Sequence, residues 1–387
     1  MIEMPWRAAS SPHFALEINR ICNISCKGCY KKLDGTTKDM RHIMLELDTL
    51  LSKKSIQTVS ICGGEPTLHP ELCDIISYIH SRKIRTSLVT NGLILDGYLL
   101  DRLKKAGLDI VMLHIDEGQD RPDLSGESKE EGVRLLRSRM AAAAASRGID
   151  VGISVTVYKE NLPGIPALIE SVMKSENIDY LFATNYFDSA AFVKQREFLK
   201  NGSAGHEARK ETGRFRTMNQ DIREALSKEF SLEPFSYLPY DGLTAGEDND
   251  LSWMSYYIPV MRDKKNYEIF RIKSNHFDKM LIYVHRLISG RFAFYFKHRS
   301  FVTAARVIVN AAITGRFHEG INFLNRAREK DCRLRAKSLV FESGPRLTGK
   351  GEISCCVFCP NATLRNGKLV HLCLADSLEE NERKNDN

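Results

Sequence analysis

The sequence predicts an α/β protein whose first half is a parallel sheet with helices packed outside it. Strand-like apolar runs alternate with amphipathic helical patterns about six times in that half, an order typical of parallel sheets. Glycine turns and polar residues directly follow several of the strand-like runs. Because active residues of such sheets gather at the carboxyl ends of the strands, these positions are the first place to look for a site.

The expected elements follow in a regular order. The strand-like segments are residues 14–21, 56–66, 84–92, 108–118, 149–161 and 178–187. The helical segments between them are residues 44–54, 70–83, 97–107, 129–148 and 165–177. Together these elements predict a first domain over residues 13–190.

The second half divides into four parts by composition. We expect a polar connecting segment, a basic and aromatic-rich helical region, a short turn-rich cysteine segment and a disordered polar tail. Their ranges are residues 191–255, 256–342, 343–378 and 379–387.

Bulk composition is that of a soluble globular protein, with 43% hydrophobic and 27% charged residues in 387. The first residues contain no basic stretch leading into an apolar run, and no apolar run is long enough to span a bilayer. We therefore expect a cytoplasmic protein, where thiols stay reduced and clustered cysteines indicate metal or catalysis.

Seven of the ten cysteines form two groups. The first holds Cys22, Cys26 and Cys29 with the spacing C-x3-C-x2-C. A structural zinc site normally uses four protein ligands, whereas three thiolates from one loop suit three irons of a cubane cluster and leave the fourth iron open. From the residues alone, zinc and iron–sulfur both remain open. The three scattered cysteines are expected to be small buried apolar residues, namely Cys62, Cys73 and Cys332.

The loop and the motifs after it resemble the radical S-adenosylmethionine (SAM) enzymes. In that family such a loop follows the first strand of a partial (β/α)6 barrel and binds a [4Fe–4S] cluster, whose open iron is chelated by SAM. The resemblance therefore implies a partial barrel, cluster ligands at Cys22, Cys26 and Cys29, and reductive cleavage of SAM to a 5′-deoxyadenosyl radical. It also implies a low-potential electron donor of the flavodoxin or ferredoxin type.

Further motifs appear in the family's order. The turn GGEP resembles the family's turn after the second strand, which holds the SAM amino group. VTNG resembles its fourth-strand motif and HIDEG its fifth-strand motif, while two sixth-strand residues are weaker candidates. The residues expected to contact SAM are Gly63, Gly64, Glu65, Pro66, Thr90, Asn91, His114, Asp116, Ser154 and Thr156.

One position departs from the family. The residue before the third cysteine is often an aromatic that packs on the adenine, but here it is Gly28, with Tyr30 on the other side of the cysteine. This change puts in question which residue contacts the adenine, and it leaves the cluster ligands unaffected.

The second cysteine group resembles the auxiliary-cluster ("twitch" or SPASM-like) segment of the molybdopterin-precursor cyclase. Its spacing is C-x2-C-x13-C, and Gly367, Leu369 and Leu374 fit the same pattern. The cyclase's Arg-x-Arg and its Gly-Gly tail are absent, so its substrate is not implied. The resemblance implies a second iron–sulfur cluster, with a four-thiolate zinc site as the alternative. The ligands would be Cys356, Cys359 and Cys373, with Cys355 or Cys332 as a fourth.

Basic charge is concentrated between residues 261 and 340, where 18 Lys and Arg face 6 Asp and Glu. Three interpretations stay open: an ordinary solvated helical face, a surface that docks on a membrane near an anionic or lipid-linked substrate, and a site for RNA or a phosphorylated substrate. The function predicted is a radical SAM enzyme with an auxiliary cluster. The alternative is a non-catalytic zinc scaffold whose basic helices bind lipid or nucleic acid.

Overall fold

The computed structural model describes most of the 387 residues. The described ranges are 2–7, 10–124, 129–200, 218–239, 251–263, 266–273, 275–294, 300–347, 353–354 and 359–385.

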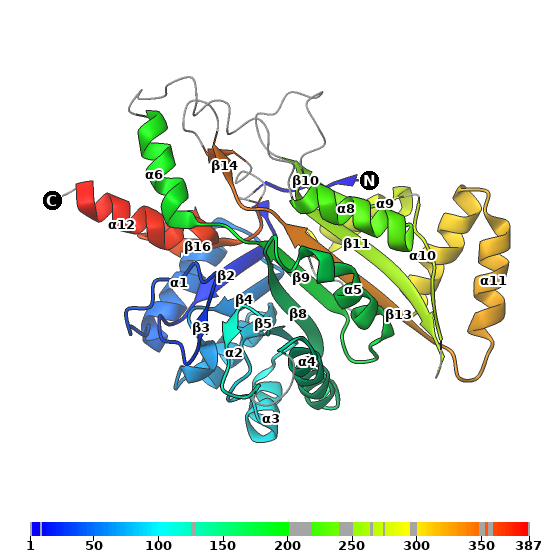
Figure 1. Cartoon of the computed structure of the whole chain (residues 1–387), viewed down its shortest axis with the longest axis horizontal. Coiled ribbons are helices and arrows are strands. Elements are labelled where there is room, and N and C mark those ends of the chain that lie inside the picture. Colours follow the sequence, from blue (N-terminus) through cyan, green and yellow to red (C-terminus); the bar gives the residue numbers. More distant parts are fainter. Residues whose placement is uncertain are drawn as a thin grey trace.

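Six parallel strands form the first part of the main sheet, in chain order from one edge inward (Figure 1). They are β2 (His13–Glu17), β4 (Thr58–Cys62), β5 (Arg85–Thr90), β6 (Ile110–His114), β8 (Asp150–Val157) and β9 (Tyr180–Asn185). Each strand is joined to the next by a crossover, which confirms the expected α/β fold of a partial barrel.

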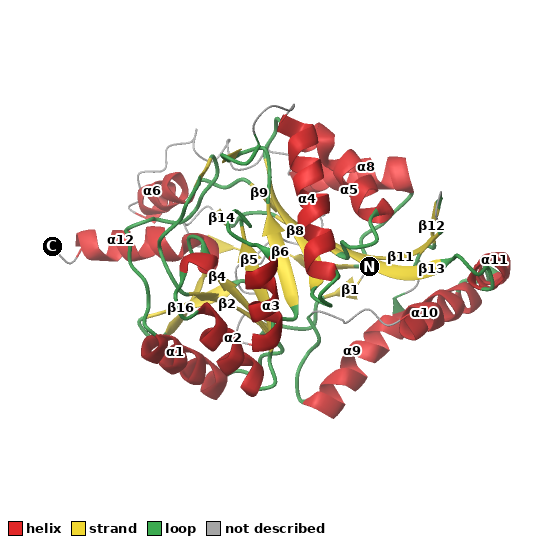
Figure 2. Cartoon of the chain, turned by 90° about the horizontal axis from the view of Figure 1, so that it is seen from below, coloured by secondary structure: helices red, strands yellow, loops and turns green. Residues whose placement is uncertain are grey.

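Five helices cover one face of these strands, as Figure 2 shows from below. They are α1 (Met40–Lys53), α2 (Leu72–Ser81), α3 (Gly97–Ala106), α4 (Lys129–Ala145) and α5 (Ile165–Lys174). Alternate strand residues such as Leu16, Ile61 and Leu113 pack under the helices in one large core. The other face of the strands carries the site described below.

Local signals in the sequence set the ends of these helices. Asp39 and Asp96 are N-caps whose carboxylates accept hydrogen bonds from the backbone N–H groups of His42 and Leu99. Gly107 ends α3 with φ of +102°, a left-handed conformation that favours glycine.

The sheet continues beyond the barrel, which the sequence did not predict. β13 (Arg333–Glu342) pairs parallel with β9, and the long β11 (Leu251–Arg262) pairs antiparallel with β13. β10 (Ser236–Pro239), β1 (Ile2–Glu3) and β12 (Tyr267–Ile269) complete an 11-stranded sheet.

Two expected segments therefore need correction. The range 191–255 was expected to be a polar connection with one helix over residues 213–230, and α8 (Met218–Phe230) agrees with that helix. Its described part also contains α6 (Ser189–Lys200, in part), β10 and the start of β11, which were not expected. The range 256–342 was expected to be helical, but both of its ends are strands. Apolar side chains of these strands, including Ile258 and Phe341, join the main core and so hold the strands in the sheet.

Helices of the basic region occupy only its middle. They are α9 (His276–Ser289), α10 (Ser300–Ile313) and α11 (Phe317–Ala327), and they lie at one end of the long axis of the molecule (Figures 1 and 2). Among the described helices, none is long and apolar enough to cross a bilayer.

The C-terminal segment lies at the other end of the long axis (Figure 1). It contains the short hairpins β14 (Arg346–Leu347) with β15 (Ile353–Ser354) and β16 (Ala362–Arg365) with β17 (Lys368–His371). After the single turn η4 (Leu372–Leu374), α12 runs over Ala375–Asn385. The expectation of a disordered tail from residue 379 is wrong up to residue 385, because carboxylates of α12 pair with buried basic groups of the barrel.

Strand numbering of three motifs also changes. Thr90 ends β5, the third strand of the barrel rather than the fourth. His114 ends β6, the fourth rather than the fifth, and Ser154 lies on β8, the fifth rather than the sixth. The motifs keep their order along the chain, so the shift changes only the strand that carries each one.

Candidate active site at the carboxyl ends of the barrel strands

The loop with the first three cysteines crosses the carboxyl ends of the barrel strands. Its short strand β3 (Ser25–Cys26) pairs antiparallel with β7 (Gln119–Asp120), which follows the fourth barrel strand. The Lys27 N–H donates to the Gly118 carbonyl at 2.8 Å. A loop that starts after the first strand is thus held over the end of the fourth.

Thiols of this loop lie close enough to oppose one another's ionisation. The pKa of Cys26 is raised to about 12, mainly by burial and also by the charges of Cys29, Asp116 and Cys22, and a hydrogen bond with Gln119 opposes this rise. Burial also raises the pKa of Cys29, with Cys22 again adding to the effect. Three crowded thiolates require a cationic partner, so the donor set fits a bound iron–sulfur cluster.

Among the described residues, no three His, Cys, Asp or Glu side chains converge as ligands of one metal ion.

The Gly-Gly turn after β4 is packed against the start of the cysteine loop. A Cβ atom on Gly63 would lie 2.4 Å from the Asn19 carbonyl oxygen, and one on Gly64 would lie 2.1 Å from that of Ile21. The Gly64 N–H donates to the Asn19 carbonyl at 3.0 Å, and the Glu65 N–H donates to that of Ile21 at 2.7 Å. The two glycines are therefore needed for this backbone contact.

Glu65 is buried and its carboxylate organises the neighbouring strand end. One oxygen accepts hydrogen bonds from the N–H and hydroxyl of Thr67 and, at 2.7 Å, from the Thr90 hydroxyl. The other accepts from the Asn91 N–H at 2.7 Å. Pro66 begins the single turn η2 (Pro66–Leu68). Glu65 and Thr90 were expected to contact SAM directly; in the structure their side chains bond to each other and to nearby backbone N–H groups.

Asn91 connects the third barrel strand to the first cysteine. Its amide nitrogen donates to the Asn23 side chain at 2.8 Å and lies 3.9 Å from the Cys22 sulfur. Its backbone carbonyl accepts a hydrogen bond from buried Arg121 at 2.8 Å. The amide is thus held where it can donate to a cysteine sulfur.

The fourth and fifth barrel strands meet at a second polar group. Asp116 is buried and accepts from the Gly118 N–H at 2.8 Å and from the Thr156 N–H at 3.1 Å. The His114 ring contacts the Ser154 carbonyl oxygen at 3.2 Å and lies 3.8 Å from the Asp116 carboxylate. These four residues come together at the ends of the fourth and fifth barrel strands.

Space beside Gly28 is occupied by two tyrosines. A Cβ atom on Gly28 would lie 2.4 Å from the Tyr158 hydroxyl and 3.0 Å from the Tyr186 ring. The two tyrosine rings lie 5.3 Å apart, and the Lys27 ammonium lies 4.7 Å above the Tyr158 ring. Tyr158 and Tyr186, which follow β8 and β9, thus fill the space where a side chain at position 28 would lie. The aromatic groups of this region come from the strand ends and not from position 28 of the loop.

Several organising residues were missed in the sequence. Asn19 donates to the Glu65 carbonyl at 2.8 Å and accepts from the Gly64 N–H, and Gln119 donates to the His114 carbonyl at 2.8 Å. A polar side chain directly after a buried strand, as at Asn19, is a signal that could have been used. No such local signal marks Tyr158, because its partner lies 130 positions earlier in the chain.

The second cysteine group is described in part. Cys355 and Cys356 lie outside the described residues. The Cys359 sulfur lies 3.6 Å from a carboxylate oxygen of Glu342, at the end of β13, and Asn361 donates to the other oxygen at 2.9 Å. Burial raises the pKa of Glu342 to about 7, although these hydrogen bonds lower it. Cys373 lies in the turn η4 that precedes α12.

One suggested ligand is ruled out by its position. Cys332 precedes β13, whereas Cys359 contacts Glu342 at the far end of that strand. A strand of 10 residues spans about 30 Å, so Cys332 cannot share a cluster with Cys359. The expectation that Cys332 might supply a fourth ligand is wrong.

Tyr30 directly follows Cys29, and its phenol lies within electrostatic reach of both cysteine groups. Burial raises the pKa of its phenol well above the usual value, and the charges of Cys62, Glu17, Cys29 and Cys373 act in the same direction. The phenol is therefore close to a cysteine of each group.

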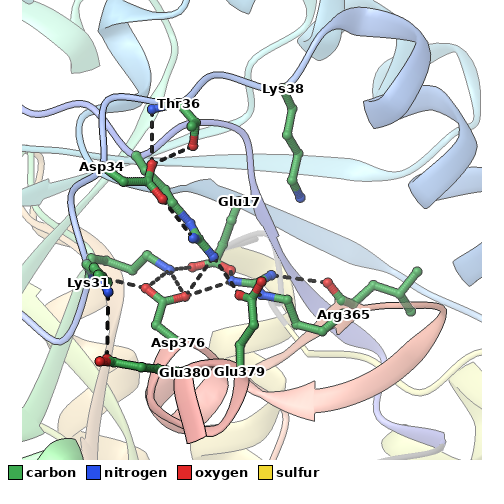
Figure 3. Close-up of polar contacts among 12 residues, drawn as sticks. Glu17, Lys31, Asp34, Thr36, Lys38, Arg365, Asp376, Glu379 and Glu380 are labelled. Atoms are coloured by element: carbon green, nitrogen blue, oxygen red, sulfur yellow. Dashed lines mark hydrogen bonds and ion pairs between the residues drawn. The ribbon is translucent and has the colours of Figure 1, made fainter. Parts of the chain in front are cut away.

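A buried cluster of ion pairs also connects these two parts (Figure 3). Lys31, two residues after Cys29, pairs with Glu17 at the end of β2 and, at 2.8 Å, with Asp376 in α12. Arg365 of β16 pairs with the same two carboxylates. The C-terminal segment is thus attached directly to the cysteine loop.

Comparison with known proteins agrees with this site. The family model of the radical SAM superfamily matches residues 16–172. Over 171 residues the chain is 28% identical to a PqqA peptide cyclase of Gluconobacter oxydans, covering 41% of this chain and 45% of the relative. Over 109 residues it is 36% identical to a probable GTP 3′,8-cyclase of Methanococcus maripaludis, covering 27% of this chain and 36% of the relative.

The matches leave more than half of each of these relatives uncovered. Among solved structures, the Streptococcus suis protein SuiB bound to its precursor peptide SuiA is similar at 16% identity and a TM-score of 0.40, over 57% of this chain and 47% of that one. The matched family region contains the cysteine loop and all the barrel motifs described above. The chain therefore carries a region, residues 16–172, that matches the radical SAM superfamily of enzymes.

Proposed function

We propose that the chain holds a [4Fe–4S] cluster on Cys22, Cys26 and Cys29 and reductively cleaves SAM to modify an anionic or lipid-associated substrate. When bound, the cluster supplies the electron that converts SAM to methionine and a 5′-deoxyadenosyl radical. A flavodoxin or ferredoxin type of protein would deliver that electron. The observation that carries the proposal is the cysteine loop, fixed over the strand ends by Gly63, Gly64 and the β3–β7 pair.

Residues around the loop would act by positioning. Asn91 donates toward the Cys22 sulfur, and hydrogen bonds to sulfur tune the reduction potential of a cluster. The Glu65 carboxylate accepts hydrogen bonds from the Asn91 N–H and from the Thr90 hydroxyl, and so fixes both residues. Asp116 ties the fourth strand end to the fifth through the Thr156 N–H.

We also infer that Tyr158 and Tyr186 supply the aromatic surface for the adenine. In this chain position 28 carries no side chain, and the two tyrosine rings occupy the adjacent space. Offset aromatic rings bind a purine face by stacking, independently of which strand carries them.

An auxiliary iron–sulfur cluster on the second cysteine group is part of the proposal. Its ligands would be Cys359 and Cys373 together with Cys356 or Cys355. Support comes from the resemblance of the spacing to the cyclase segment and from the relation of Tyr30 to both cysteine groups.

Anaerobic reconstitution followed by iron analysis tests the proposal. We expect about eight irons in the native chain, about half of them lost with Cys26→Ala or with Cys373→Ala. Only Cys26→Ala should abolish SAM cleavage, because the auxiliary cluster does not bind SAM. The matched control is Cys332→Ala, at the far end of β13, which should keep all the iron. A colourless protein that contains only zinc would instead establish the zinc scaffold.

A further inference from the structure

Helix α9 exposes an apolar stripe instead of burying it. Met280, Tyr283, Val284, Leu287 and Ile288 recur at the spacing of one helical face, and all five are exposed. Leu287 and Ile288 are 85% and 83% exposed, which is unusual for large aliphatic side chains.

The next two helices repeat this arrangement. On α10, Phe301 is 84% exposed and Ile308 lies two turns further along the same face. On α11, Phe317, Ile321 and Leu324 are exposed at helical spacing. Three consecutive helices therefore each carry an uncovered apolar stripe, and we call these residues the outer apolar face.

The three stripes point away from the sheet. The opposite face of each helix is the buried one, through Ile282 on α9, Val307 on α10 and Phe323 on α11. Val307 and Phe323 pack in a small core with Met261 of β11. Since α10 lies beside both α9 and α11, the three stripes are on neighbouring helices at this end of the molecule (Figure 2).

The segment that carries these helices has a positive net charge, since residues 276–327 contain eight Lys and Arg and only two acidic residues. Asp278 pairs with Arg306 and Glu319 with Arg316, while Arg326 pairs with Asp263 and Glu268. At 100° per residue, exposed Lys279 and Arg286 border the α9 stripe on one side.

We propose that the outer apolar face docks on an anionic lipid bilayer. Exposed aliphatic and aromatic side chains bordered by basic residues are the combination that inserts below lipid headgroups while neutralising their charge. A second copy of the chain fits less well, because it would bring two positively charged surfaces together. The proposal does not depend on the chemistry of the cysteine loop.

Flotation of the full chain with vesicles tests this proposal. We expect binding to vesicles of phosphatidylcholine with 30% phosphatidylserine, weak binding to phosphatidylcholine alone, and release at high salt. The variant Leu287→Asp/Ile288→Asp should lose at least tenfold in partitioning. Lys279→Glu/Arg286→Glu should lose a similar factor, since each basic residue near the surface contributes about fivefold.

The matched control is Leu45→Asp on α1, an exposed leucine of the barrel, 65% exposed. It should bind like the native chain, and circular dichroism should show that all variants melt like it. The proposal is overturned if the native chain does not float with anionic vesicles, or if both aspartate substitutions leave flotation unchanged. The proposal is also overturned if the native chain self-associates in sedimentation, does not float, and loses self-association in the Leu287→Asp/Ile288→Asp variant. The outer apolar face would then bind a second copy of the chain.

Discussion

Replacing Lys31 by Met should strongly destabilise the protein, because Lys31 is buried and pairs with two buried carboxylates, Glu17 and Asp376 (Figure 3). The exposed fraction of the Lys31 side chain is 2%. In the variant Glu17 keeps Arg365 as a partner and Asp376 keeps Arg365 and Arg20, but both carboxylates lose the buried ammonium group. Breaking a buried pair by removing one partner costs about 3–5 kcal/mol in the free energy of unfolding.

Thermal unfolding under anaerobic conditions measures this cost. At about 1.2 °C per kcal/mol for a chain of this size, Lys31→Met should lower the midpoint by about 4–6 °C. The matched control is Lys32→Met, because Lys32 is 59% exposed and lies 3.8 Å from Glu380. That exposed pair contributes about 0–1 kcal/mol, so the control should shift by no more than about 2 °C.

A double substitution separates the ion pair from the lost side chain. Lys31→Met/Asp376→Asn removes one charge of each sign, so it should be less destabilised than the sum of the two single variants. Additive effects, or a Lys31→Met midpoint equal to that of Lys32→Met, would refute the interpretation. Because Lys31 is two residues from Cys29, Lys31→Met should also retain less iron after desalting.

Two further predictions concern single sites. Gly28→Ala should weaken SAM binding in equilibrium dialysis several-fold, because the new Cβ atom would lie 2.4 Å from the Tyr158 hydroxyl. Adding Tyr158→Phe removes that hydroxyl and should restore binding. If binding is not restored, the clash with the hydroxyl is not the cause of the loss. Stability should fall by about 2 kcal/mol between pH 7 and pH 5 through His13 alone. Burial lowers the pKa of His13 to about 3 in the folded chain, whereas in the unfolded chain the pKa of this residue is about 6.5. Between pH 7 and pH 5 only the unfolded chain therefore takes up a proton. The stabilisation that is present above pH 6.5 is lost as the pH falls. His13→Gln should flatten this dependence of the melting midpoint, and an equally steep fall in that variant would refute the assignment.

Local patterns in the sequence predicted the barrel and the position of its site. Each buried strand, such as β4, ends directly in a motif, and chain order alone places those ends at one edge of the sheet. The strands β11 and β13 were missed, although β11 is rich in aromatic and β-branched residues. Their positive charge and the helices between them favoured a helical interpretation, whereas pairing with β9 is a long-range contact that no local pattern expresses.

Polar composition misled the prediction of the C-terminus in a similar way. The sequence around Glu379 resembles a solvated tail, and propensity alone gives such a segment no reason to be ordered. In the fold Glu379 pairs with Arg20 at 2.9 Å, and Asp376 accepts from the Lys32 N–H at 3.0 Å. Order in α12 therefore depends on partners more than 340 positions away in the chain.

The ion pairs at α12 also bear on how the two cysteine groups relate. Cys373 lies three residues before Asp376, and Cys29 lies two residues before Lys31, so the Lys31–Asp376 pair fixes the two groups relative to each other. Tyr30 adds a buried phenol close to Cys29 and Cys373. A second cluster held this way would be built onto the cysteine loop itself rather than onto an independent domain. Loss of either cluster should therefore loosen the segment that carries the other. The connection runs through Tyr30, Lys31 and Lys32, the three residues that follow Cys29.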